Sequence, residues 1–172
     1  MSTRSQIQFK DNYNTAQIYR HSDGYPDSEV GVIADLKELK DCLERTSSFR
    51  DASYLAAQFI FREKLKHTRI YQDGKYTSDG KPIVTVEDVL NTDTNQPNFL
   101  LGHGVEDPSS GIHGDEEYLY VVEVGEGKKW HIKVSGHRSF PTWEDENREK
   151  AFEMAKWQFE GTLDQAYKKY VK

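Results

Sequence analysis

The sequence is poor in cysteine and has no long hydrophobic run, and these two scarcities argue against whole classes of protein. A single cysteine, Cys42, cannot form an internal disulfide, so nothing indicates an oxidising compartment. No apolar stretch approaches the roughly 20 residues of a membrane span, and no hydrophobic signal core follows the N-terminus. We therefore expect a soluble, cytoplasmic protein without a membrane segment.

Positive charge is also scarce. The chain has 23 Lys and Arg residues against 29 Asp and Glu residues, which gives a formal net charge of -6 at pH 7. Because nucleic acid phosphates require a basic face, this balance argues against nucleic acid as a partner. An acidic surface instead suits docking on a basic partner. A length of 172 residues predicts one compact domain over 1–172.

Complete catalytic signatures are missing as well. The sequence has no glycine-rich phosphate loop between a strand and a helix, no serine nucleophile elbow and no Cys-x-x-Cys pair. These absences disfavour nucleotide-dependent enzymes and thiol enzymes, and no cofactor is predicted. Whether the protein is an enzyme stays open at the level of sequence.

The stretch around which the chain is organised spans residues 18–26, Ile-Tyr-Arg-His-Ser-Asp-Gly-Tyr-Pro. Its first residues favour a strand, and Asp23 with the following glycine supplies the chemistry of a tight turn. The proline then forces Tyr25 into an extended conformation, so that a helix begins only afterwards. Asp27 or Ser28 is predicted to cap that helix.

Polar side chains at this turn could form a site. Arg20, His21 and Asp23 stand at a strand end beside a predicted helix N-terminus, where they could hold an anion or place a base beside a carboxylate. Tyr25, in the same turn, is a candidate binding residue together with Arg20. The more ordinary alternative is that Arg20 and Asp23 pair with each other or with the turn backbone and only fix the bend.

Hydrophobic patterning predicts a β-hairpin at the start of the chain. Residues 4–10 alternate in polarity as in a half-buried strand, and residues 16–20 resume as a second strand after a polar turn. The expected register places Ile7, Phe9 and Ile18 on the core face.

Two stretches of the sequence carry a resemblance. The chain opens with Met-Ser-Thr-Arg-Ser-x-Ile and continues to the Ile-Tyr-Arg-His-x-Asp-Gly-Tyr-Pro turn, while residues 117–121 read Glu-Tyr-Leu-Tyr-Val. In these features it resembles a group of uncharacterised proteins from phages, prophages and other mobile elements. The resemblance implies an accessory role in a mobile element and brings no catalytic residue with it.

Two helices are predicted after the turn, over 28–45 and over 52–67, because apolar residues recur at helical spacing. Beyond them the signal weakens. Ile70 and Tyr71, before an Asp-Gly turn, suggest a short hairpin, and residues 83–90 could be a strand or a helical turn. A short apolar strand is expected at 99–101.

A second concentration of polar residues follows, on a stretch with glycines at 102, 104, 111 and 114. His103, His113 and Asp115 could bind a divalent metal, or the two histidines could form an acid–base set with His21 and Asp23. Their spacing matches no established ligand motif. A solvated acidic loop is therefore the more ordinary interpretation, and no metal is predicted.

The clearest hairpin of the sequence joins strands over 118–124 and 129–135, and the first is apolar on both faces, as expected of a central strand. A long C-terminal helix is predicted from Pro141 onwards, capped by Thr142. Trp157 falls off the apolar stripe of that helix. It either covers a second edge of the core or is offered to a partner or a twin subunit, which would make the protein a homodimer.

Together these elements predict an α+β domain with a mainly antiparallel β-sheet, helices packed on it and a long C-terminal helix. Two functions are compatible with the sequence. The first is an accessory binding protein that docks on a host or phage protein and could inhibit a defence system. The alternative is a small hydrolase of phosphoester or nucleotide substrates, in which His21 and Asp23 face His103 or His113 while Arg20 holds a phosphate.

Overall fold

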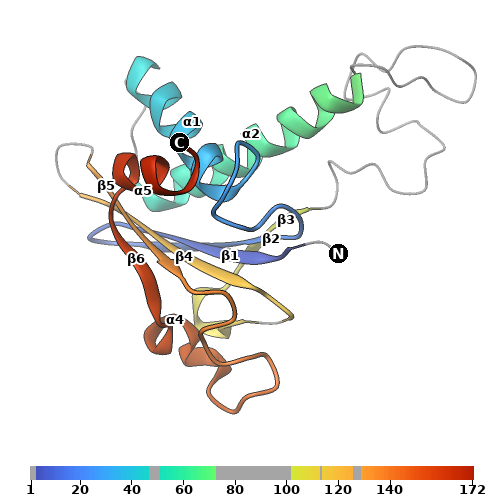
Figure 1. Cartoon of the computed structure of the whole chain (residues 1–172), viewed down its shortest axis with the longest axis vertical. Helices are drawn as coiled ribbons and strands as arrows, with labels where there is room; N and C mark the ends of the chain where they lie inside the picture. The colour runs from blue at the N-terminus through green and yellow to red at the C-terminus, as the bar shows by residue number, and fades with distance from the viewer. Residues whose placement is uncertain (1–2, 47–50, 73–101, 113, 126–128) are drawn as a thin grey trace, which may run out of the picture.

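The computed structural model builds the chain around one sheet (Figure 1). It describes residues 3–46, 51–72, 102–112, 114–125 and 129–172. The strand expected at 99–101 and the ambiguous residues from 73 onwards lie outside the described part. The hairpin predicted around Ile70 and Tyr71 is wrong, because a helix that spans Ala52–Gln72 continues through both residues.

Six strands form a mixed sheet in the order β3-β2-β1-β4-β5-β6. They are β1 (Ser5–Lys10), β2 (Thr15–Arg20), β3 (His103–Glu106), β4 (Tyr118–Val124), β5 (Trp130–Ser135) and β6 (Trp157–Thr162). Neighbours pair antiparallel except β1 and β4, which are parallel. The α+β class is therefore confirmed, whereas the sheet, expected to be mainly antiparallel, is mixed.

The parallel pair follows from the connection between its two strands. β1 and β2 form the predicted hairpin, with Ile7 opposite Ile18. β4 reaches the other side of β1 only after the helices α1 (Val32–Thr46) and α2 (Ala52–Gln72), and a long crossover of this kind lets two strands run in the same direction. β4 thus lies inside the sheet, as predicted.

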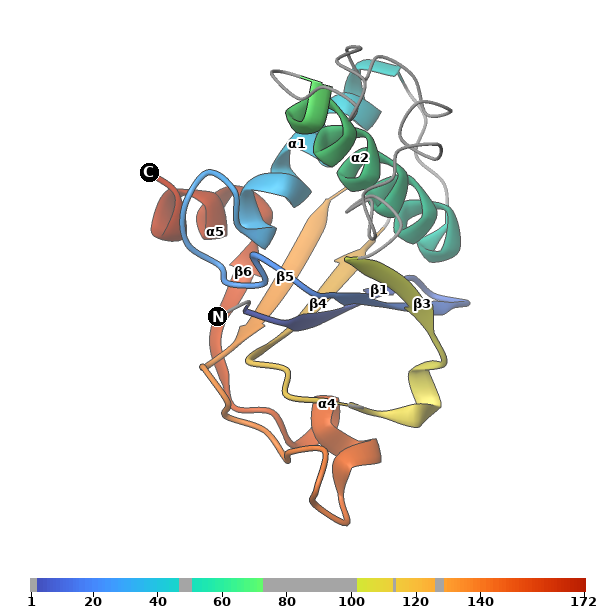
Figure 2. The ribbon, with the colours of Figure 1, turned by 90° about the vertical axis from the view of Figure 1, so that its right-hand side faces the viewer.

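Three helices, α1, α2 and α5 (Leu163–Tyr170), cover one face of the sheet, as Figures 1 and 2 show. The main hydrophobic core lies between them and the sheet, and it includes Ile7, Phe9 and Ile18 as predicted. We call this side the helix-covered face. Among the described residues, no helix is both long enough and apolar enough to cross a membrane.

The opposite face of the sheet carries a smaller hydrophobic cluster. It is covered by α4 (Ala151–Met154), the short 3-10 helices η1 (Pro108–Ser110) and η2 (Arg148–Lys150), and the loops around them (Figure 2). The buried members of this cluster are Ile112, Leu119, Phe140, Ala151 and Ala155. β1 is therefore buried on both faces. The alternating polarity of its residues had predicted a strand with only one buried face.

α1 begins four residues later than predicted. Ser28 has a φ of 72°, in the left-handed region, so the chain turns there instead of entering a helix. The backbone N–H of Val32 donates to the carbonyl of Tyr25 at 3.0 Å, which closes the turn. Asp27 and Ser28 thus lie in the turn, and the prediction that one of them caps the helix is wrong.

The predicted long C-terminal helix is also wrong. The segment contains η2, α4, strand β6 and only then α5, whose N-cap is Thr162. Thr162 and Gln165 form a capping box, which stops the strand and starts the helix. Thr142, the predicted cap, instead closes a tight turn in which its N–H donates to the Asp145 carboxylate at 2.6 Å.

Candidate functional site

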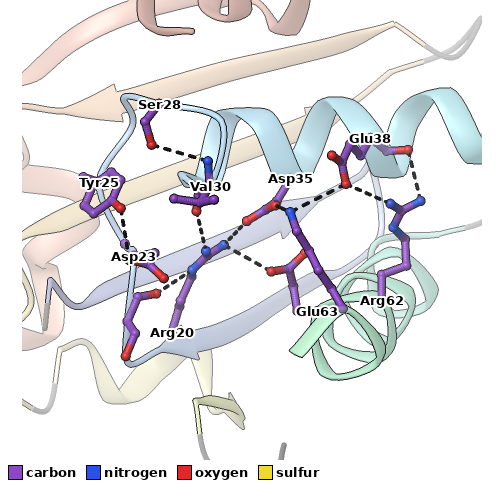
Figure 3. Close-up of polar contacts among 12 residues, drawn as sticks. Arg20, Asp23, Tyr25, Ser28, Val30, Asp35, Glu38, Arg62 and Glu63 are labelled. Carbon is purple, nitrogen blue, oxygen red and sulfur yellow. Dashed lines mark hydrogen bonds and ion pairs between the residues drawn. The ribbon is translucent and has the colours of Figure 1, made fainter. Parts of the chain in front are cut away.

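The turn after β2 holds a buried ionic cluster. Arg20 is the last residue of β2, and its side chain is 2% exposed beneath α1 and α2 (Figure 3). Its Nη1 donates to Oδ2 of Asp35 at 2.5 Å and lies 3.6 Å from Oε2 of Glu63. Nζ of Lys66 lies 2.7 Å from the other Asp35 oxygen. We call these four residues the Arg20 cluster.

The remaining donors of Arg20 are also used inside the chain. Nε donates to the carbonyl of Ser22 at 2.8 Å and Nη2 to the carbonyl of Val30 at 3.0 Å (Figure 3). Burial alone would lower the pKa of Arg20, but the carboxylates of Asp35 and Glu63 outweigh it and the pKa is raised. Arg20 therefore holds β2, the turn and two helices together, and its guanidinium faces no open surface for a phosphate.

Glu63 is the unusual member of the Arg20 cluster. Its side chain is 3% exposed, and burial, followed by the nearby charge of Asp35, raises its pKa to about 8. Arg20 and Lys66 act in the opposite direction. At neutral pH the cluster therefore has two cations, the Asp35 carboxylate and a largely protonated Glu63.

The other polar residues of the turn pair locally. The hydroxyl of Tyr19 lies 2.9 Å from Nδ1 of His21, and the hydroxyl of Tyr25 donates to Oδ1 of Asp23 at 3.0 Å. Asp23 has a φ of 54°, which an aspartate tolerates better than most residues. Asp23 and Tyr25 thus bind each other within the turn. The structural alternative considered from sequence paired Arg20 and Asp23 with each other or with the turn backbone; Arg20 does donate to the Ser22 carbonyl, whereas Asp23 binds the Tyr25 side chain.

The two polar stretches meet along the backbone but not through the predicted side chains. β3 pairs with β2, with His103 opposite Arg20, and the N–H of His21 donates to the carbonyl of Gly102 at 2.7 Å. The ring of His103 packs 6.1 Å from that of Phe59, on the helix-covered face.

His21 belongs to the opposite face. It contacts Tyr19, which follows the core residue Ile18 on β2 and so points away from the helices. His21 and His103 therefore do not share a cleft, and His113 lies outside the described residues. The geometry gives no support to an acid–base pair made of His21 and His103.

A buried glutamine network was not anticipated from the sequence. On the opposite face, Glu106 accepts hydrogen bonds from the amides of Gln6 at 2.5 Å and Gln17 at 3.3 Å. Both amides also donate to the carbonyl of Gly111, and Gln8 donates to Gln17 at 2.7 Å. The available signal was the pair Gln6 and Gln8 at alternate positions of the first predicted strand, with Gln17 beside the core residue Ile18 on the second, which places all three on the face opposite the core.

Residues 114–116, at the end of the acidic stretch, line a hollow of about 190 Å³ on the same face. Asp115 forms an ion pair with Arg4, and Glu116 accepts a hydrogen bond from the N–H of Gly114 at 3.0 Å. Trp143, 46% exposed, lines the hollow, although the sequence gave it no role. The complete lining is Gly114, Asp115, Glu116, Arg138, Phe140, Thr142, Trp143 and Glu144.

Metal ligands do not gather in the described part of the chain. It contains no group of three or more His, Cys, Asp or Glu side chains that could hold an ion. Of the set considered from sequence, His103 faces the helices and Asp115 pairs with Arg4, while His113 falls outside the described residues.

Trp157 lies on β6 and not on a helix. Its ring is half-buried and packs against the smaller hydrophobic cluster together with Phe152. This position corresponds to the first of the two alternatives for Trp157, a cover for a second edge of the core.

Comparisons with known proteins give no further assignment. No family model matches the chain, and the searches found no similar curated protein and no similar solved structure.

Proposed function

We propose that this chain is an accessory binding protein of a phage or mobile element, which acts by contact with a host or phage protein. Inhibition of a host defence system is one role that such contact would serve. The mobile-element origin comes from the resemblance in the first residues and the turn, and the binding role comes from the surface. The observation that carries it is the exposure of large aromatic side chains on the described surface.

Three of these rings lie on the first half of α2 or in the turn beside its start. Tyr54 and Phe61 are seven residues apart on the helix, two turns, so both point the same way, and they are 51% and 67% exposed. The carboxylate of Asp11 accepts a hydrogen bond from the N–H of Ala52 at 2.6 Å. That bond holds the β1–β2 turn, which carries the 91% exposed Tyr13, against the start of the helix.

We call Tyr13, Tyr54 and Phe61 the α2 surface. Aromatic side chains are enriched among the residues that contribute most to protein–protein affinity, because one ring removes a large area from water at a low entropic cost. The hydrolase alternative has no comparable support, since the described candidates for its chemistry are engaged within the fold. We therefore assign the α2 surface to a protein partner.

Site-specific photocrosslinking tests this proposal. The full chain, with p-benzoylphenylalanine in place of Phe61, is produced in host cells and irradiated, and Glu160, 53% exposed on β6, is replaced in a matched control. We expect a discrete adduct from position 61 and none from position 160. Against the identified partner, Phe61→Ala should weaken binding by at least about tenfold, with an unchanged melting temperature. Identical adducts from both positions, or none from either, would contradict the proposal.

A further inference from the structure

The hollow beside Trp143 is built from two segments that are distant in sequence. Residues 114–116 form one side and residues 138–144 the other. Phe140, 9% exposed, anchors the second segment in the smaller hydrophobic cluster, while Trp143 stays at the surface. One wall of the hollow is thus fixed by the core, while the indole of Trp143 stays accessible. The volume of the hollow, about 190 Å³, is below the 300–1,000 Å³ typical of pockets for drug-sized ligands.

The charges around the hollow are unequal. Three carboxylates line it, those of Asp115, Glu116 and Glu144, against the single guanidinium of Arg138. Nη2 of Arg138 lies 3.8 Å from Oε1 of Glu117, outside the lining, so part of its charge is matched there. Even after the ion pair between Arg4 and Asp115 is counted, the formal charge is negative.

An exposed indole beside carboxylates suits one chemical group in particular. A guanidinium is planar and weakly hydrated, stacks on the face of tryptophan and pairs with carboxylates through directed hydrogen bonds. An ammonium group has the same charge, but it lacks the plane and is more strongly hydrated. A hollow of this size accepts one long side chain.

We propose that the hollow beside Trp143 binds an arginine side chain of the protein partner. The indole of Trp143 stacks on the guanidinium, and Glu144, with the buried Glu116, supplies the opposite charge. The inference rests on the proposed binding function and adds the chemistry of the partner to it. The arginine site would be a second contact, on the face of the sheet opposite the α2 surface. Either one partner molecule reaches around this protein to both contacts, or two partner molecules bind.

Titration with capped amino acids tests the site directly. The full chain, labelled with ¹⁵N, is titrated with Nα-acetyl-arginine amide, the lysine analogue and the citrulline analogue, which has the shape of arginine without its charge. We expect the indole N–H signal of Trp143 to move with arginine, with a dissociation constant on the order of 1–10 mM. The signal of Trp130, buried in the main core on the helix-covered face, is an internal control that should stay in place.

Lysine should bind at least about threefold more weakly than arginine, and citrulline should cause no saturable shift. Glu144→Gln should weaken arginine binding about threefold to tenfold, while Glu149→Gln, an exposed residue outside the lining, should leave it unchanged. An equal response to citrulline, or no shift of the Trp143 signal up to 100 mM arginine, would overturn the proposal.

The two proposals fail separately. A position-specific adduct at Phe61 without any arginine response removes the arginine site and leaves the binding protein. An arginine response without a partner at the α2 surface leaves the site and removes the assignment of that surface.

Discussion

The two faces of the sheet are built in different ways. The helix-covered face buries a continuous apolar core, and within it Arg20, Asp35 and Glu63 of the Arg20 cluster are at most 3% exposed, while Lys66 reaches the surface. The opposite face carries a smaller apolar cluster among the described residues, together with a glutamine network and the hollow beside the acidic residues 115 and 116. The Arg20 cluster on the first face therefore holds the fold together, whereas Arg138 and Glu144, beside the hollow on the second face, remain exposed.

The sharpest test of this contrast is Arg20→Met. The substitution leaves Asp35 and Glu63 buried without the guanidinium between them, and breaking a buried ion pair in this way costs about 3–5 kcal/mol of unfolding free energy. Urea unfolding followed by circular dichroism measures the loss. Arg62→Met, which removes the exposed pair with Glu38, is the control and should cost below about 1 kcal/mol. Equal losses would erase the distinction between the faces.

The protonation of Glu63 gives a second prediction. In the unfolded chain Glu63 releases its proton near pH 4.5, whereas in the folded chain the pKa is about 8. Because the folded state holds the proton over this interval, the contribution of Glu63 to stability falls as pH rises from about 5 to 8. Glu63→Gln, which stays neutral, should gain about 3–4 kcal/mol over the wild type across that range. Parallel pH curves for the two proteins would mean that Glu63 is charged in the fold.

A third prediction concerns the opposite face. Gly111 has a φ of 67°, and a Cβ there would lie 2.2 Å from the carbonyl oxygen of Arg148. Gly111→Ala should therefore cost about 2 kcal/mol and disturb the glutamine network, whose amides donate to the Gly111 carbonyl. Gly125→Ala is the control, because a Cβ there meets nothing within 4 Å. Thermal unfolding of both variants compares them, and equal stability would contradict the close approach.

The smallest expected effect lies at α5. Thr162→Ala removes the hydroxyl that accepts a hydrogen bond from the N–H of Gln165, and loss of an N-cap costs about 1 kcal/mol. Thr162→Ser keeps the hydroxyl and should restore most of the stability. Chemical denaturation of the three proteins decides the point: if alanine and serine behave alike, the capping box contributes nothing.

Local pattern predicted the elements whose partners are close in sequence. The β1–β2 and β4–β5 hairpins and the start of α2 were all visible, because alternation and helical spacing are properties of short windows. The prediction of a long C-terminal helix failed because Phe159, Leu163 and Ala166 also fit the apolar stripe of a helix. Period-two alternation at Trp157, Phe159 and Gly161, followed by the Thr162 cap, was the competing signal.

The candidate sites depend on contacts between residues that are far apart in the sequence, which no short segment contains. Arg20 and Glu63 come together only because α2 packs across β2, and Gln6 meets Glu106 only because β3 joins the edge of the sheet. Sequence placed Arg20 at a polar turn but could not distinguish an anion-binding arginine from a buried one. Trp143 and Arg138 had no motif around them, so the hollow was invisible before the two segments met.

The parallel pairing of β1 with β4 has a consequence for synthesis on the ribosome. β1 and β2 can pair as soon as both have emerged, yet the other edge of β1 waits for β4, whose first residue is Tyr118. Roughly a hundred residues of translation separate the two events, about 5–20 s at ~5–20 residues per second. During that interval the nascent hairpin exposes an apolar strand edge able to pair with another chain, so a chaperone that shields it should raise the yield of folded protein.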